Sequence, residues 1–532
     1  MPSTLIIRGG TVYDGTGAPG IRADVAVDGD RILGIGSIPD NENALVLDAT
    51  GCAVAPGFVN ILSHAYISLQ QDPRGLSDLY QGVTTEIFGE GFSMGPVAGR
   101  GLETVSLDVQ PDGTRHGFPR LGQFLDHLSG TGVGQNVASF VGSHNMRMLG
   151  AGYDNRPLTA AELDAARALL DEELADGALG LGSALIYPPE SYSSTEELIA
   201  LSRVVARHDA LYIAHIRSEG DRLLEGIEEI LRIGREASAR VEVYHLKAVG
   251  RGNRPKLQAA IDLIDQARDT GLPATANIYP YEAGSTFLAA AIPPPFHVGG
   301  NDRLVERLRD KAAREEIKAA IRAPQDEWEN LLVIAGGPDQ VLLLDNALPG
   351  SATAGLTLSR AAADHGTEDP LDLLMDLVAA KPDLMAAYFI SHEDNVRKAL
   401  RRPWVSIGSD SESVPAEPPF TDIPVHPRSY GTFARILGRY VREEGILTLE
   451  DAVRRMTSLP AGTLRLTDRG RLAPGAYADI AVFDPATIID HATYEQPHQY
   501  ATGMRHVVVN GTPALRDHVP TGALAGRALR RG

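Results

Sequence analysis

Short apolar runs alternate with amphipathic helical stretches between residues 55 and 466. TAAELDAARALLDEELADG and GDRLLEGIEEILRIGREAS are two of the helical stretches. Eight apolar runs have the length and composition of buried strands: 55–62, 83–89, 137–142, 179–184, 211–215, 241–246, 274–280 and 405–410. Because parallel strands need crossover helices between them, this alternation predicts the α/β class and a (β/α)8 TIM-type barrel, whose active site lies at the C-terminal ends of the strands.

The two ends of the chain have a different pattern, in which short apolar strands are separated by Gly, Pro and Asn. Such a pattern is typical of antiparallel sheets. Its presence at both ends predicts one small β-sandwich domain built from residues 1–55 and 467–532, with the barrel at 56–466. The stretch between the seventh and eighth strands is too long for one crossover helix, so we expect an inserted subdomain at about 286–350.

Composition narrows the class of protein. With 43% hydrophobic residues in 532 and a mean hydropathy of −0.10, the chain is typical of soluble globular proteins. A single cysteine, Cys52, excludes an intramolecular disulfide and a cysteine-rich metal site. The first residues do not resemble a signal peptide, and no window holds about 20 consecutive apolar residues. We therefore expect a cytoplasmic protein without a membrane partner.

The formal net charge is −20, from 69 acidic and 49 basic residues that are spread along the chain. Without a basic stripe, nucleic acid is an unfavourable partner. A few local cations can still bind an anionic small molecule, whatever the net charge. The sequence leaves the number of subunits open, and a homo-oligomer is compatible with it.

Residues able to bind a metal stand at the ends of predicted strands. His215 ends LYIAH and His245 lies in VEVYHL, the next strand, so both imidazoles are expected at one end of the barrel. Glu90 follows the second strand between two glycines, which permit a tight turn. Each residue alone can equally be a core histidine or a loop carboxylate. Together they form a three-ligand set that leaves a position for water, which predicts one divalent metal ion, zinc.

Asp410 follows the last predicted strand, in SIGSDSES. An aspartate before a serine is common in turns, so the motif alone is a weak signal. Beside a metal site, however, this carboxylate is placed to accept a proton from water. We therefore interpret Asp410 as the catalytic base.

Long motifs along the chain resemble those of the D-aminoacylase branch of the amidohydrolase superfamily, the N-acyl-D-amino-acid deacylases. They are LIIRGGTVYDGTGAP, DATGCAVAPGFVN, ALIYPPESYSSTEELIAL, AHIRSEGDRLLE, YHLKAVGR, YPYEAGST, HPRSYGTFARILGRYVRE and ADIAVFDPATIIDHATYEQPH. The resemblance covers essentially the whole chain. It implies a metal-dependent hydrolase that cleaves the carbon–nitrogen amide bond of a small-molecule substrate, an N-acyl-D-amino acid.

The resemblance also implies roles for single residues. The family's metal-binding histidines match His215 and His245, and its catalytic aspartate matches Asp410. Its contacts to the substrate carboxylate match Lys247, Tyr279, Ser285 and Arg428. Structural alternatives exist, because Lys and Arg usually lie in solvent and a serine can cap the following helix.

Two positions depart from the family pattern. Where the family has a His-x-His pair after the first strand, this chain has Leu62 and His64, and leucine cannot bind a metal. Where the family has a metal-ligating cysteine, this chain has Glu90. Its remaining ligand set resembles the single-metal arrangement of some N-acetylglucosamine-6-phosphate deacetylases. We therefore expect one metal ion rather than two.

The departures leave some roles open. His64 can serve a weak second metal, hydrogen-bond the substrate or only pack, and His144 in VGSHNMR can orient the substrate carbonyl or fix its loop. An alternative function is hydrolysis of a D-terminal peptide, a cyclic amide or a specialised metabolite. A catalytically inactive binding protein is a further alternative, against which the presence of Asp410 argues.

Overall fold

The computed structural model describes residues 3–110, 112–324, 327–348, 350, 352–422 and 424–531. Each of the eight apolar runs overlaps a strand, and the third run overlaps two. The strands are β6 (Phe58–Asn60), β7 (Val83–Phe88), β8 (Asn136–Ser139), β9 (Val141–Gly142), β10 (Gly180–Ala184), β11 (Leu211–His215), β12 (Arg240–Val243), β13 (Ala274–Ile278) and β17 (Val405–Ile407). The third run is divided because β8 pairs with β7, whereas β9 pairs with β10.

The barrel strands are all parallel to their neighbours. β13 lies directly beside β17, although more than a hundred residues separate them in the sequence. A parallel bridge between Ser63 and Ser411, with the Asp410 N–H donating to the Leu62 carbonyl at 2.8 Å, connects the last strand to the first. The α/β barrel predicted from the sequence is therefore confirmed, and its C-terminal strand ends meet at one edge.

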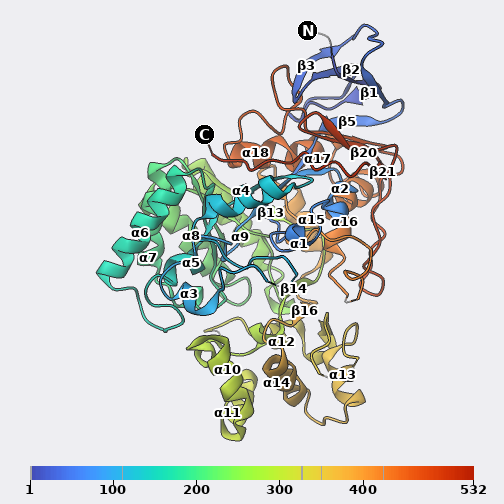
Figure 1. Ribbon diagram of the computed structural model, residues 1–532. Coiled ribbons are helices and arrows are strands. Elements are labelled where there is room, and N and C mark those ends of the chain that lie inside the picture. Colours follow the sequence, from blue (N-terminus) through green and yellow to red (C-terminus); the bar gives the residue numbers. More distant parts are fainter. Residues whose placement is uncertain are drawn as a thin grey trace.

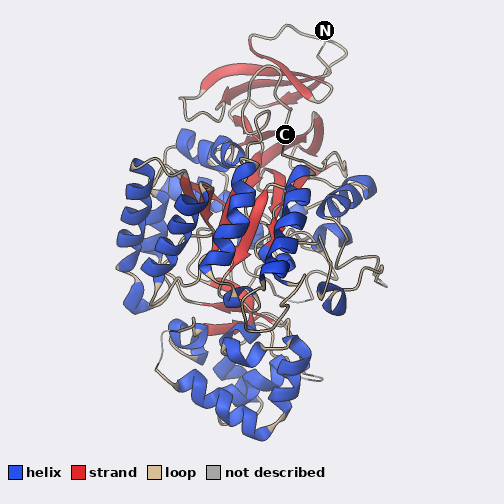
Figure 2. Cartoon of the chain, turned by 90° about the vertical axis from the view of Figure 1, so that its left-hand side faces the viewer, coloured by secondary structure: helices blue, strands red, loops and turns tan. Residues whose placement is uncertain are grey.

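Helices surround the barrel strands (Figure 2). Capping boxes mark where two of them begin: the Thr159 and Ser194 side chains accept from the backbone N–H three residues later, and Glu162 and Glu197 reciprocate. No helix in the described part of the chain is long and apolar enough to cross a membrane. The helices are α1 (Ser68–Gln71), α2 (Leu76–Leu79), α3 (Gly101–Thr104), α4 (Leu121–Thr131), α5 (Ser143–Arg147), α6 (Ala160–Ala175), α7 (Thr195–Arg207), α8 (Leu223–Ala237), α9 (Lys256–Asp269), α15 (Glu393–Leu400), α16 (Arg428–Arg435), α17 (Leu449–Met456) and α18 (Ser458–Thr463).

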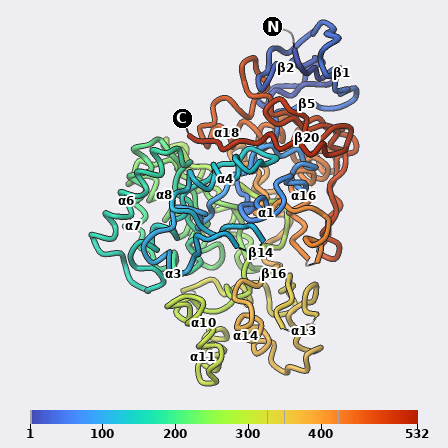
Figure 3. Tube along the Cα trace, viewed as in Figure 1, coloured from blue at the N-terminus to red at the C-terminus, as the bar shows by residue number. Residues whose placement is uncertain are grey.

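Both ends of the chain contribute to one nine-stranded sheet, in which β5 pairs antiparallel with β18. Figure 3 shows these N-terminal and C-terminal segments side by side at the top of the molecule. Alternate residues of the sheet pack into an apolar cluster of their own, around Ile7, Val54 and Ile480. The strands are β1 (Leu5–Val12), β2 (Ile21–Asp28), β3 (Arg31–Gly36), β4 (Leu45–Asp48), β5 (Ala53–Pro56), β18 (Ile480–Phe483), β19 (Met504–Val509), β20 (Thr512–Arg516) and β21 (Val519–Pro520).

The segment between β13 and α15 forms a separate unit at the end of the molecule opposite the terminal sheet (Figure 1). It has its own apolar core, which includes Leu304, Leu343 and Leu374. This unit continues past residue 350, because β16 pairs with both β14 and β15. Its elements are β14 (Gly284–Phe287), α10 (Gly300–Arg309), α11 (Lys311–Arg322), α12 (Leu331–Ala335), β15 (Val341–Leu343), α13 (Leu358–Asp364), α14 (Pro370–Ala380) and β16 (Met385–Tyr388).

Candidate metal centre

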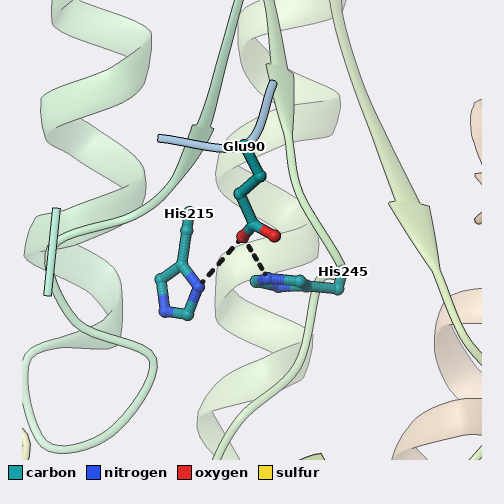
Figure 4. Close-up of side chains that lie close together, drawn as sticks. All are labelled: Glu90, His215 and His245. Carbon is teal, nitrogen blue, oxygen red and sulfur yellow. Dashed lines mark hydrogen bonds and ion pairs between the residues drawn. The ribbon is translucent and has the colours of Figure 1, made fainter. Parts of the chain in front are cut away.

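Glu90, His215 and His245 converge at the C-terminal edge of the barrel (Figure 4). The Glu90 Oε1 atom lies 2.8 Å from Nε2 of His245 and 3.3 Å from Nδ1 of His215. The two imidazole rings meet edge to face, with their centres 4.5 Å apart. His215 is the last residue of β11 and His245 lies two residues beyond β12, so neighbouring strands carry the two rings to the same place.

The chemistry and spacing of these donors fit a small divalent cation. In a tetrahedral zinc site the ligand atoms lie about 3.4 Å apart, because each is about 2.0–2.2 Å from the metal. One carboxylate oxygen and two imidazole nitrogens lie within 4.8 Å of one another here. All three side chains are largely buried, which favours a charge-balanced metal site over isolated ionised groups. Glu90, His215 and His245 can therefore hold the metal.

Backbone packing explains why Glu90 stands between glycines. Gly89 and Gly91 adopt φ angles of +105° and +67°, which residues with a side chain rarely adopt. A Cβ atom at Gly89 would lie 2.4 Å from the carbonyl oxygen of Phe140, and one at Gly91 would lie 2.7 Å from Cβ of Ala184. The two glycines let the loop press against the neighbouring strands, so the Glu90 side chain reaches the histidines.

Asp410 lies beside this cluster, in contact with His64 and Arg428. Its Oδ1 is 2.9 Å from Nε2 of His64, and its Oδ2 accepts a hydrogen bond from Nη1 of Arg428 at 2.7 Å. Burial, the largest single influence, disfavours the ionised carboxyl, but Arg428, His245 and His64 together outweigh it, and the pKa of Asp410 falls below its usual range. This carboxylate is therefore ionised at neutral pH, as a general base must be.

His64 contacts two carboxylates, because its Nε2 also lies 3.2 Å from Oε2 of Glu90. Burial opposes the charged ring, but hydrogen bonds with Asp410 and Glu90 raise the pKa of His64 to about 10. These polar contacts disagree with a role in packing alone. Leu62, by contrast, is buried in the apolar cluster that includes Val59.

The four residues matched to substrate binding lie around the same edge of the barrel. The guanidinium carbon of Arg428 is 4.7 Å from the centre of the Tyr279 ring, and its Nη2 donates to the Ser285 carbonyl at 3.3 Å. Ser285 lies within β14 and does not cap a helix. The Lys247 ammonium is bound at 2.8 Å to a carboxylate that the sequence did not single out, Glu219.

His144 lies in α5 and packs against two aromatic rings, Phe92 at 5.6 Å and Tyr153 at 5.8 Å between ring centres. Burial, together with the nearby Arg147 guanidinium, lowers the pKa of His144 to about 4. The ring is therefore neutral at physiological pH. A neutral imidazole can donate one hydrogen bond to a carbonyl, so both roles considered for His144 stay open.

Two buried residues that support the histidines were missed. Glu219 lies 3.1 Å from Nδ1 of His245, and Asn277 accepts a hydrogen bond from the His245 backbone N–H at 2.8 Å. A signal existed for Glu219, since it stands four residues after His215 in HIRSE. Asn277 had no such signal, because its partner lies on the neighbouring strand.

Comparisons with known proteins identify the family of this chain. The amidohydrolase family model matches residues 358–514. The chain is 33% identical to the D-aminoacylase of Alcaligenes xylosoxydans xylosoxydans, over 100% of this chain and 98% of that protein. It is similar over 100% of both chains to two solved structures. One is the N-acyl-D-glutamate deacylase of Bordetella bronchiseptica in complex with zinc and a phosphonate inhibitor, at 31% identity and a TM-score of 0.82.

The other solved structure is a D-aminoacylase with a binuclear metal centre, for which one-metal activation and second-metal attenuation are described, at 32% identity and a TM-score of 0.81. The sequence similarity above 30% identity covers the full length of the chain, and the folds are similar over the same length. The chain therefore belongs to the D-aminoacylase family of N-acyl-D-amino-acid deacylases, within the amidohydrolase superfamily.

Proposed function

We propose that this protein is a zinc-dependent deacylase that hydrolyses the amide bond of N-acyl-D-amino acids. The observation that carries the proposal is the convergence of Glu90, His215 and His245, with Asp410 beside them, at the end of the barrel where active sites form. Family membership supports the reaction class, because the relatives are named as deacylases.

Asp410 carries the proton in the proposed mechanism. When bound, the metal polarises the scissile carbonyl and favours deprotonation of the attacking water. Asp410 accepts the proton of that water as the oxygen attacks the carbonyl carbon, and donates it to the amine nitrogen as the C–N bond breaks. One water thus yields a carboxylic acid and a D-amino acid. Arg428 and His64 orient the carboxylate by binding its two oxygens.

We propose that the substrate α-carboxylate binds beside Arg428, with Tyr279 and Ser285 close to it. The Nε atom of Arg428 is buried and has no hydrogen-bond partner among the described residues, so one donor of this guanidinium is unused. Lys247 belongs to the same proposed set, although Glu219 already binds its ammonium. His144 is assigned to the substrate carbonyl, and His64 to a hydrogen bond with the substrate as well as with Asp410.

We further propose one zinc ion per chain and a cytoplasmic enzyme. Leu62 occupies the place of a ligand that a second metal would need, which supports a single tight site. The alternatives are hydrolysis of a D-terminal peptide, a cyclic amide or a specialised metabolite, and a protein without catalysis. These alternatives are kept because Leu62 replaces a histidine of the family at the end of the first strand.

Turnover assays with zinc-loaded protein distinguish these functions. A panel of N-acetyl D- and L-amino acids should show release of free D-amino acid, with little from the L-isomers. Metal-free protein should be inactive and recover on addition of zinc. Activity only on D-terminal dipeptides or cyclic amides would identify those compounds, rather than N-acyl-D-amino acids, as the substrate. A zinc-loaded protein inactive on the whole panel would favour a binding protein.

A further inference from the structure

Glu219, in the loop after β11, faces the histidine nitrogens that point away from Glu90. Its Oε1 lies 3.1 Å from Nδ1 of His245, and its Oε2 lies 3.5 Å from Nε2 of His215. Each imidazole therefore has one nitrogen toward Glu90 and the other toward Glu219. Glu219 is only 2% exposed, so solvent does not compete for these contacts.

The two rings need opposite tautomers to serve one metal. His215 presents Nδ1 to the ligand cluster, whereas His245 presents Nε2. A neutral imidazole that binds a metal through one nitrogen carries its proton on the other. The protons then belong on Nε2 of His215 and Nδ1 of His245, which are the two atoms that face Glu219. Its two oxygens can accept both.

Lys247 holds the Glu219 carboxylate, donating to Oε1 at 2.8 Å. The same ammonium lies 2.8 Å from Nδ1 of His245. Because an ammonium only donates, that contact belongs to the tautomer whose proton sits on Nε2 and points to Glu90, 2.8 Å away. Once Nε2 is a metal ligand, the ring must carry its proton on Nδ1. There, Glu219 is in place to accept a hydrogen bond from the N–H group.

Glu329 fixes the loop that carries Glu219, although it comes from the inserted unit more than a hundred residues later. Its Oε1 accepts from the backbone N–H groups of Glu219 and Gly220 and from Oγ of Ser218. One of its carboxylate oxygens lies within 4.8 Å of a carboxylate oxygen of Glu219 and a ring nitrogen of His215. Both Oε2 of Glu329 and Nε2 of His215 are buried without a hydrogen-bond partner among the described residues.

We propose that Glu219 is a positioning residue that holds both histidine ligands in the tautomer and orientation that metal binding needs, and that Glu329 acts on the metal site through it. The proposal rests on the proposed role of His215 and His245 as ligands. Carboxylates that accept the second N–H of a ligating histidine typically contribute about ten- to a hundredfold to metal affinity.

The test measures zinc affinity of the full-length protein by competition with a chelator, together with thermal unfolding of the metal-free form. Glu219→Gln should weaken zinc binding about ten- to a hundredfold. Glu219→Asp, which keeps the charge, should recover part of the loss. Glu329→Gln should weaken binding less, and the double variant should bind no more weakly than Glu219→Gln, because Glu329 acts through Glu219.

Glu229→Gln is the matched control. Glu229 lies ten residues after Glu219 and its carboxylate binds Arg217 at 2.9 Å and Thr195 at 2.7 Å, so the variant breaks an ion pair of the same segment. It should keep the parental zinc affinity even if unfolding shifts.

Parental zinc affinity in Glu219→Gln would overturn the proposal, and so would an equal loss in the control. If Glu219→Gln does not fold, Glu329→Gln decides alone: parental affinity in that variant overturns the proposal and a reproducible loss supports it. A parent protein that binds no zinc would overturn the proposed function as well, whereas a zinc-binding parent with unaffected variants overturns only this inference.

Discussion

At the scale of single residues, a substitution of Asp410 distinguishes the catalytic step from metal binding. Asp410→Asn keeps the shape of the side chain but removes the base, so kcat should fall by about 10²- to 10⁴-fold while zinc content stays at the parental value. Turnover assays with elemental analysis of the same samples measure both.

In contrast, His215→Ala and His245→Ala should lose zinc and activity together. An active, zinc-replete His245→Ala protein would show that the ligand was wrongly assigned.

Glu90 presents a second test at this scale, because it stands where the family's cysteine is expected. Glu90→Gln keeps the size of the side chain but removes the negative charge that balances the cation, so zinc affinity should fall by orders of magnitude. Glu90→Cys should keep more zinc than Glu90→Gln, since a thiolate is also an anionic ligand. Equilibrium dialysis gives both affinities. Tight zinc binding and turnover in Glu90→Gln would make Glu90 a structural loop residue.

At the scale of elements, hydrogen bonds between neighbouring strands fix the backbone at His245. His245 has a φ of +35°, and its backbone N–H donates to Oδ1 of Asn277 on β13, whose Nδ2 donates to Glu242 on β12 at 2.8 Å. Asn277→Ala leaves that buried N–H without its acceptor, which costs about 1–3 kcal/mol. We expect a lower free energy of unfolding in denaturant and weaker zinc binding.

Thr275→Val is the control for this strand, since it removes only the hydroxyl that binds Glu242 at 2.6 Å. It should reduce stability while zinc affinity is retained. If both variants bind zinc like the parent, Asn277 supports the strand but not the ligand.

At the scale of the whole molecule, the number of metals per chain tests the altered first strand end. After dialysis against a weak chelator, elemental analysis should find about one zinc ion per chain, because Leu62 offers no ligand. His64→Asn should leave that number unchanged. Two retained ions, falling to one in His64→Asn, would instead identify His64 as a ligand of a second site with Glu90 and Asp410, a cluster whose donors already lie within 4.8 Å.

The sequence by itself determined the fold class and the set of polar strand ends. Strand and helix periodicities are local, and parallel strands must finish at one edge, so Glu90, His215, His245 and Asp410 were brought to the same region by pattern alone. The chain positions of the eight strands followed in the same way. The break at Phe140 did not, because it depends on pairing with two different neighbours.

Only the tertiary structure decided which groups each side chain meets. Lys247 turns toward Glu219, Ser285 lies in a strand, and Arg428 binds Asp410, none of which has a local signal. Glu329 reaches the loop before α8 from an inserted unit with its own core. These contacts join residues of different elements, so they depend on how whole elements pack rather than on the residues beside them in the sequence. Buried polar groups need hydrogen-bond partners, and the tertiary packing of the elements determines which partners are within reach.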